Sequence, residues 1–374
     1  MKFLILNADY TEFLRWFYAQ YPGLEKQPYA AQIHARAESL FGAADFYSSN
    51  LQKLGHEAWD IRVNNESIQR MWAKERGMPV SPIHSWHFVL RRGIVPWTKR
   101  IKNQQWLYEI LTAQIKFFKP DILLNQAMES VSSQFLQEIK PHIRLLIGQV
   151  AAPLSPNQDY NCYDLIISSL DNFVEYFRKQ GIPSERLHLG FDPKVLERLG
   201  KPNDKSIPVS FVGGLSRIHE ERVNLLEQLC RHVDLQIWGT AIQDVPTHLH
   251  LRRWYKGQAW GYDMYRILQR SKITLNHHGR WAGPYANNCR LYEATGVGTL
   301  LITDWKVNLP NLFEPGKEVV VYRTTEECAE LVKYYLEHEK ERESITQAGQ
   351  QRTLNEYTYY QRMQELTHIV QKYL

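Results

Sequence analysis

The feature that most constrains the fold is a repeated alternation of short apolar runs with helical patterns, present in both halves of the 374-residue chain. Short runs rich in Leu, Ile and Val are typical of buried parallel strands, and the amphipathic segments between them are typical of crossover helices. Such alternation predicts parallel sheets with helices on both faces. The sequence therefore predicts an α/β protein.

The alternation forms two blocks separated by a linker at 199–208, which is rich in Gly, Pro, Asn, Asp and Lys and has no apolar period. The chain is also too long for one ordinary core. We predict two doubly wound, Rossmann-like domains, 1–200 and 201–374, facing a deep cleft, with a last helix that could pack back on the first domain. The expected strands are 3–7, 57–63, 121–125, 143–150, 164–168 and 187–189, then 208–212, 234–238, 272–276, 299–303 and 318–322. The expected helices are 29–54, 104–118, 132–139 and one from 170 to Gly181, then 216–230, 262–269, 288–295, 324–339 and 361–370.

Cysteine usage and charge limit the function classes. The cysteines Cys162, Cys230, Cys289 and Cys328 have no paired spacing, which argues against a zinc site or a disulfide framework and favours a reducing compartment. The first apolar run is too short for a signal peptide or a membrane span. The formal net charge of +5 is too small for a nucleic-acid-binding protein. We expect a cytoplasmic protein without a transmembrane segment or a nucleic-acid partner.

The stretch 271–304 reads as a strand, a polar loop, a short helix and a second strand. Ligands of α/β proteins bind where strand ends meet a helix N-terminus, which attracts anions. Glu293 lies one turn inside this helix, and a fixed carboxylate can accept both hydroxyls of a ribose. Glu293 could instead face solvent, although its apolar neighbours Leu291 and Ala294 indicate a mostly buried helix in which an idle glutamate is costly.

A second candidate loop follows the first strand of the second block. Gly213 and Gly214 would let backbone N–H groups approach a pyrophosphate, and Arg217 would supply a bidentate cation. Tight turns also need glycine, so the motif alone is weak. Arg222 falls more than a turn into the following helix and is expected to be a solvated surface charge. Trp238 ends the next strand, where it would flank a nucleobase or simply belong to the core.

The run 288–304, together with 312–322, 334–336, 348–349 and 357–362, resembles the C-terminal domain of CgeB-like (spore maturation) glycosyltransferases. These look like a branch of the group 1 GT-B nucleotide-sugar transferases. The resemblance covers about residues 205–370, and 190–193 looks like the family's interdomain junction. The N-terminal half matches in pattern alone.

The resemblance implies roles for the residues of the second domain. Glu293 matches the glutamate that binds the donor ribose, with Asn288 and Arg290 flanking it as in the family pattern. Gly213 and Gly214 match the loop that faces the diphosphate, with Arg217 as the nearest cation. Better-known members carry a second glutamate that contacts the donor sugar, and Tyr285 stands at that position here, which puts the sugar and the retaining stereochemistry in doubt. The polar groups nearest the sugar would then be His277, as a candidate catalytic residue, His278 and Gly279, although any one of these histidines could be buried and satisfied.

The first block contains a basic and aromatic segment at 70–106, where eight Lys and Arg face a single acid, Glu75, with four Trp interleaved. Its prolines break long helices, so we expect an inserted flap over the cleft that could hold an anionic or lipid-linked acceptor, or touch a membrane surface. A solvated helical face with packed tryptophans is the alternative. The acceptor wall would be lined by residues at strand ends: Asp9, Asn125, Gln126 and Gln149. Asp9, or one of the two histidines in the segment, would serve as general base.

The function predicted is metal-independent transfer of a sugar from a nucleotide-diphosphate sugar to an acceptor hydroxyl, with no cofactor. In such a site a helix N-terminus and Arg217 would stabilise the leaving diphosphate. No Asp-x-Asp triplet, the usual metal-binding signature of other transferases, occurs in the chain. Two alternatives stay open: a nucleotide-sugar epimerase of GT-B fold, and a non-catalytic protein that binds an anionic polymer. The pattern sets no oligomeric state.

Overall fold

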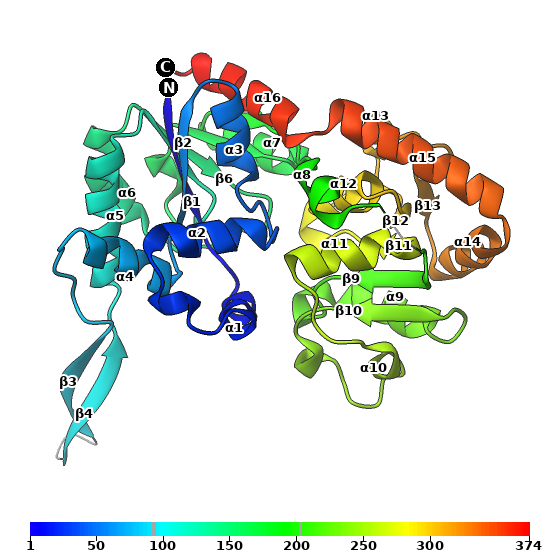
Figure 1. Cartoon of the computed structure of the whole chain (residues 1–374), viewed down its shortest axis with the longest axis horizontal. Helices are drawn as coiled ribbons and strands as arrows, with labels where there is room; N and C mark the ends of the chain where they lie inside the picture. Colours follow the sequence, from blue (N-terminus) through cyan, green and yellow to red (C-terminus); the bar gives the residue numbers. More distant parts are fainter. Residues whose placement is uncertain (92–94, 157, 202–203) are drawn as a thin grey trace.

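The computed structural model describes residues 1–91, 95–156, 158–201 and 204–374, with the side chains of 85–102 left out. Two parallel sheets, each covered by helices, lie side by side (Figure 1). This confirms the predicted α/β class with two Rossmann-like units.

The N-terminal sheet is parallel throughout, with strand order β2-β1-β5-β6-β7-β8. Its strands are β1 (Lys2–Asn7), β2 (Glu57–Arg62), β5 (Ile122–Asn125), β6 (Leu145–Gln149), β7 (Leu165–Ser168) and β8 (Ser184–Arg186). The helices of this half are α1 (Thr11–Gln20), α2 (Tyr29–Glu38), α3 (Phe46–Lys53), α4 (Glu66–Glu75), α5 (Gln105–Phe118), α6 (Ser133–Ile139), α7 (Asp171–Lys179) and α8 (Lys194–Leu199).

The C-terminal sheet is also parallel, with order β10-β9-β11-β12-β13. Its strands are β9 (Ile207–Val212), β10 (Leu235–Trp238), β11 (Ser271–Asn276), β12 (Leu300–Asp304) and β13 (Val320–Tyr322). The helices are α9 (Glu220–Leu229), α10 (Leu251–Trp254), α11 (Gly261–Gln269), α12 (Cys289–Gly296), α13 (Leu309–Leu312), α14 (Thr325–Glu337), α15 (Glu339–Glu356) and α16 (Tyr359–Gln371).

The apolar strands form because both faces of each sheet are covered. Residues 3–6 of β1 have no exposed surface, and the same holds for Ile122, Leu123 and Leu124 of β5. A strand buried on both faces needs apolar side chains at every position, which explains the continuous runs in the sequence. One buried cluster contains both Phe3 of the first sheet and Leu301 of the second, so the apolar core continues across the domain boundary.

The last helix, α16, leaves the C-terminal domain and packs on α3 of the N-terminal domain (Figure 1). Thr358 caps it in a capping box with Gln361. The crossing is fixed by two backbone hydrogen bonds, in which Phe191 N–H donates to Tyr357 O and Tyr359 N–H donates to Phe191 O. The two chain termini therefore lie close together on the N-terminal domain.

Several predicted elements were wrong in detail. The long helix expected at 29–54 is two helices, α2 and α3, because Leu40, Gly42 and Ala44 adopt left-handed backbone angles between them. The strand expected at 187–189 lies earlier, as β8.

The segment 70–106 also differs from the expected flap. It contains the end of α4 and an antiparallel hairpin of β3 (His84–Arg91) and β4 (Val95–Lys102). In Figure 1 the hairpin projects from the N-terminal domain on the side away from the C-terminal domain. Arg92 of this segment lies outside the described residues.

Candidate functional site

A cavity of about 510 Å³ lies between the two domains, at the carboxyl ends of the C-terminal strands. The C-terminal domain supplies most of its wall, and the N-terminal domain contributes Tyr10, Phe41 and Gly42. A cavity of this size at the strand ends of a doubly wound sheet is where such folds bind ligands. Its lining residues are Tyr10, Phe41, Gly42, Phe211, Val212, Gly213, Gly214, Ser216, His219, Arg222, Gly239, Thr240, Ala259, Trp260, Met264, Asn276, Asn288, Cys289, Arg290 and Glu293.

The loop that follows β9 brings backbone close to the cavity. Gly213 and Gly214 line it, and a Cβ at Gly213 would come within 2.9 Å of the Phe211 ring. Gly239, at the end of β10, has no room for a side chain because its Cβ would collide with the Gly213 carbonyl. These glycines therefore allow a close approach of two strand ends and leave main-chain groups at the cavity wall.

Arg222 is the cation of this loop, which corrects the prediction that it is a solvated surface charge. Its side chain is 9% exposed, and its guanidinium donates to Gly214 O at 3.0 Å and His277 O at 2.7 Å. Burial lowers the pKa of Arg222 to about 10, so the group stays charged at neutral pH. Its Nε is buried without a partner among the described residues. Arg217, the predicted cation, is exposed in the turn before α9 and does not line the cavity.

Glu293 enters the cavity from the second turn of α12. Its carboxylate pairs with Arg290 at 2.7 Å, and both side chains are largely buried, at 12% and 13% exposure. Arg290 also donates to Val212 O at 3.0 Å, which ties the pair to the end of β9. The arginine therefore holds the carboxylate in a fixed direction, as a ligand-binding group requires.

Asn288 is the N-cap of α12, with its side chain accepting from Leu291 N–H at 3.3 Å. Its amide also donates to Asn276 Oδ1 at 2.9 Å, which joins the helix start to the end of β11. Both asparagines line the cavity. The cap and the strand end are thus held as one unit.

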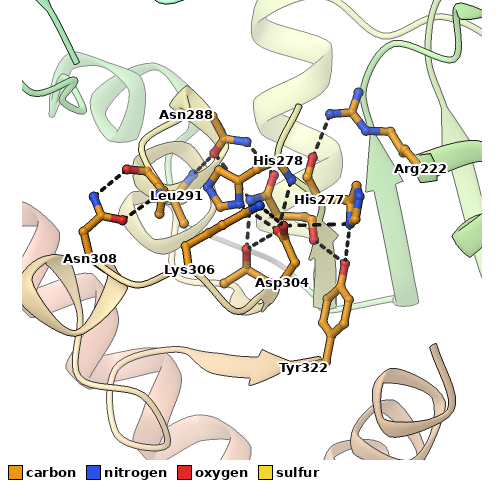
Figure 2. Close-up of polar contacts among 12 residues, drawn as sticks. Arg222, His277, His278, Asn288, Leu291, Asp304, Lys306, Asn308 and Tyr322 are labelled. Atoms are coloured by element: carbon orange, nitrogen blue, oxygen red, sulfur yellow. Dashed lines mark hydrogen bonds and ion pairs between the residues drawn. The ribbon is translucent and has the colours of Figure 1, made fainter. Parts of the chain in front are cut away.

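The polar residues after β11 form a network with the ends of β12 and β13 (Figure 2). His278 donates its backbone N–H to Asp304 Oδ1 at 3.0 Å, and its Nδ1 lies 2.7 Å from the same oxygen. His277 Nδ1 lies 3.1 Å from the Tyr322 hydroxyl, and burial lowers the pKa of His277. Lys306 Nζ lies 3.4 Å from Asp304 Oδ2. His277, His278 and Gly279 line a small recess beside the cavity.

The N-terminal wall contacts the C-terminal domain through an aromatic cluster. Trp260 is 4% exposed, and its ring meets the Phe41 ring edge-on at 5.0 Å and the Phe13 ring at 5.8 Å. Trp260 and Phe41 both line the cavity. Tyr10, which is 66% exposed, stands at the N-terminal side of the same opening.

Other predicted site residues lie away from the cavity. Trp238 is half-buried and packs against the large apolar core. Tyr285 packs against the apolar cluster of the N-terminal domain, as does the neighbouring Trp281, whose Nε1 donates to Ala151 O at 3.0 Å. The loop between β11 and α12 therefore bridges the two domains.

Asp9, the candidate base, is 5% exposed and does not line the cavity. Burial raises the pKa of Asp9, but Arg36 and Arg62 outweigh it and the net direction is down. Arg36 Nη2 lies 2.6 Å from Asp9 Oδ1 and Arg36 Nε lies 3.1 Å from Oδ2. A carboxylate held by a buried arginine in this way is a poor proton acceptor.

The remaining residues of the predicted acceptor wall are hydrogen-bonded within the N-terminal domain. Gln126 Nε2 donates to Gln149 Oε1 at 2.7 Å, and Gln149 Nε2 donates to the Tyr47 hydroxyl at 2.8 Å. Asn125 is fully buried and donates to Tyr163. None of these side chains, and no described residue of 70–106, lines the cavity.

Sequence reasoning did not single out Thr240, Trp260 or Asp304. Asp304 ends an apolar strand next to β11, so the rule that strand ends of a parallel sheet converge could have found it. Trp260 has no local signal, because its role depends on contacts with residues more than 200 positions away. Among the described residues, no group of three or more His, Cys, Asp or Glu side chains is arranged to hold a metal ion.

Comparison with known proteins gives one family match and several solved structures of similar fold. Residues 221–368 match a family described as glycosyl transferase-like. HepE from Anabaena, solved with UDP-glucose, is 12% identical over the full length of both chains, with a TM-score of 0.60. A glycosyltransferase from Rickettsia africae is 11% identical over 100% of this chain and 98% of that chain, with a TM-score of 0.59. Sucrose-phosphate synthase from Thermosynechococcus elongatus is 9% identical, with coverage of 100% and 99% and a TM-score of 0.56.

Comparison with curated protein sequences gives no significant match. At these identities the solved structures define the fold, which is the two-domain GT-B fold of glycosyltransferases, as predicted. In the part of the chain that the structure describes, no helix is both long and apolar enough to cross a membrane.

Proposed function

We propose that the protein is a glycosyltransferase that binds a nucleotide-diphosphate sugar in the interdomain cavity and transfers the sugar to an acceptor hydroxyl. The observation that carries the proposal is the convergence of Glu293, the Gly213–Gly214 loop and Arg222 on one cavity of about 510 Å³. These groups supply a carboxylate, a cation and the backbone N–H of Gly214, which are groups that a ribose and a diphosphate require. The N–H of Gly213 is occupied, since it donates to Trp238 O at 3.0 Å. The solved HepE complex with UDP-glucose supports this class of donor.

The proposed mechanism assigns each part of the donor to one wall. Glu293, oriented by Arg290, accepts hydroxyls of the donor ribose. The glycine loop and the N-terminus of α9, a helix of ten residues, face the diphosphate. Arg222 stabilises the charge that develops on the leaving diphosphate, in place of a divalent ion, so we propose metal-independent transfer with no cofactor.

The acceptor enters from the N-terminal side, past Tyr10 and Phe41. Residues 76–108, which include the projecting hairpin, contain no Asp or Glu and six Lys or Arg. Because no described residue of this segment lines the cavity, we propose that it binds an anionic or lipid-linked acceptor outside the cavity. We also propose that the protein belongs to the CgeB-like branch of the family, because the residues of α12 and β12 resemble that branch. We also propose a cytoplasmic location, because the cysteines have no paired spacing.

The test is nucleotide binding by the wild type and by Glu293 variants, measured by calorimetry against UDP, GDP, TDP and their sugars. Glu293→Gln keeps an oxygen for Arg290 but removes the negative charge, and we expect affinity to fall by about 10- to 100-fold, the value of one or two charge-assisted hydrogen bonds. Glu293→Ala should nearly abolish binding. Glu337→Gln, at an exposed glutamate near the end of α14, is the matched control and should bind as the wild type does.

Two results would contradict the proposal. Unchanged affinity of both Glu293 variants for every nucleotide would reject the donor site. Interconversion of the donor sugar without transfer or hydrolysis would favour the epimerase alternative.

A further inference from the structure

A small recess of about 10 Å³ opens beside the cavity and shares His219 and Arg222 with it. A volume of this size holds one water molecule, or one hydroxyl group of a larger ligand. His277, His278, Gly279 and Arg280 supply the wall from the loop after β11. The recess is therefore a polar site for a single oxygen atom at the edge of the proposed donor cavity.

His278 is the residue of this recess whose ring is most firmly fixed. It is 3% exposed, and Asp304 Oδ1 receives both its backbone N–H and its Nδ1 (Figure 2). Burial raises the pKa of Asp304, but its bond to His278 and the nearby His277 and Lys306 outweigh this and lower it well below the usual range. Asp304 is thus a carboxylate, which can only accept, so Nδ1 carries the hydrogen and donates.

The second ring nitrogen, Nε2, is buried and has no hydrogen-bond partner among the described residues. With Nδ1–H bound to Asp304, Nε2 is the remaining hydrogen-bonding atom of the ring. Leaving a buried hydrogen-bonding atom unpaired is unfavourable, so a partner is expected. His277 differs, because its Nδ1 is already within hydrogen-bond distance of the Tyr322 hydroxyl.

The charges around the recess favour an O–H partner over a phosphate oxygen. Glu220 and Glu221 line the recess together with Arg222 and Arg280, and the two carboxylates oppose a phosphate group there. A hydroxyl group carries no charge, can donate to Nε2 or accept from it, and fits the volume.

We propose that His278, held by Asp304, binds one hydroxyl of the donor sugar through Nε2 and so determines which sugar is accepted. This inference rests on the proposed donor site. It would supply a sugar contact in a chain where Tyr285 replaces the expected second glutamate and packs on the N-terminal domain.

The experiment compares the affinity for a nucleotide sugar with that for its nucleoside diphosphate, using UDP-glucose and UDP, GDP-mannose and GDP, and TDP-glucose and TDP. The pair that binds the wild type most tightly is then measured with His278→Asn and His278→Gln. The amide of Asn reaches the Nδ1 position and keeps the contact with Asp304, whereas the amide of Gln reaches the Nε2 position and can accept there. Thermal unfolding establishes that each variant is folded.

We expect His278→Asn to lower the affinity for the nucleotide sugar by about 5- to 10-fold, the value of one neutral hydrogen bond. Its affinity for the nucleoside diphosphate should be unchanged. His278→Gln should stay within about 2-fold of the wild type for both ligands. His232→Asn, at an exposed histidine, is the matched control.

Three outcomes would overturn the inference. If Gln weakens binding and Asn does not, His278 acts through Asp304 as a structural residue. If the affinities for both ligands fall equally, Nε2 contacts the diphosphate and not the sugar. If neither variant changes the difference between the two ligands, the recess holds water alone. Absence of any nucleotide binding by the wild type would instead reject the proposed function itself.

Discussion

Arginine side chains near the glycine loop show how burial decides a role at the scale of one residue. Arg217 and Arg222 are five positions apart, and a local reading favours the first because it follows the glycines directly. In the structure Arg217 faces solvent, whereas Arg222 turns toward the loop and binds Gly214 O and His277 O. A charge in a partly dry cavity acts more strongly on a ligand than one in water.

Replacing each arginine by methionine tests this difference. We expect Arg222→Met to lower the affinity for the best-binding nucleoside diphosphate by about 10- to 100-fold, since a hydrogen bond or contact with a charged group is worth roughly 1.5–3 kcal/mol. Arg217→Met should change the affinity by less than about 2-fold, because solvent screens its charge. Calorimetry on both variants measures the effect. A larger loss in Arg217→Met would return the diphosphate role to that residue.

At the scale of elements, the start of α11 fixes the contact between the domains. Gly261 has φ of 47°, and Tyr262 N–H donates to Ser39 O at the end of α2, at 2.9 Å. A Cβ on Gly261 would collide with that same carbonyl oxygen. The glycine is therefore needed for a close approach of two backbones as well as for its positive φ, and it places Trp260 in the aromatic cluster.

Gly261→Ala should separate the two domains at this contact. We expect weaker donor binding and a larger radius of gyration in solution scattering, because Trp260 and Phe41 line the same cavity. The matched control is Gly23→Ala, which has φ of 86° but open space around its Cβ. In the control, the free energy of unfolding should fall by about 1 kcal/mol because of the positive φ, and donor binding should be unchanged. Equal effects of the two substitutions would show that the collision is unimportant.

At the scale of the whole molecule, the two sheets are joined by more than the linker. Helix α16 packs on α3, and one apolar cluster continues from the first sheet to the second. On the side of β7, Asn287 of the C-terminal domain donates to Ser169 O at 2.9 Å and lies 2.6 Å from His188 Nδ1. Contacts on both sides of the cavity therefore set the relative position of its walls.

The His188 contact predicts a pH dependence of stability. Burial, with Arg186 and Arg362 nearby, lowers the pKa of His188 to about 4 from 6.5. Between these values the unfolded chain binds a proton that the folded protein does not, so stability is complete above pH 6.5 and falls as the pH drops toward 4. The loss should be about 2 kcal/mol at pH 5 relative to pH 7.5.

Urea unfolding at several pH values measures this loss. His188→Asn places an amide oxygen near the Nδ1 position for Asn287 and cannot titrate, so its stability should fall less than that of the wild type between pH 7.5 and 5. His232→Asn, at an exposed histidine, should follow the wild type. Parallel curves for the wild type and His188→Asn would exclude His188 as a source of the pH dependence.

The sequence alone determined the α/β class, the two-domain division of the sheets, most strand positions, and a glycine loop and glutamate at strand ends. These features follow from short-range pattern, since a strand buried on both faces must be apolar and a turn between close backbones must contain glycine. Glu293 and Gly214 could be placed at the cavity because their positions relative to their own strand or helix are local.

The tertiary structure alone decided which side chains meet across the sheet and between the domains. The pairing of His278 with Asp304 joins residues 26 positions apart, and the contact of Trp260 with Phe41 joins residues of different domains. The break in the expected helix at 29–54 has the same origin, because residues 40–44 turn to bring Phe41 to that contact. The local sequence pattern determines which face of a helix or strand is apolar. The packing of elements that are distant in the sequence determines what that face contacts.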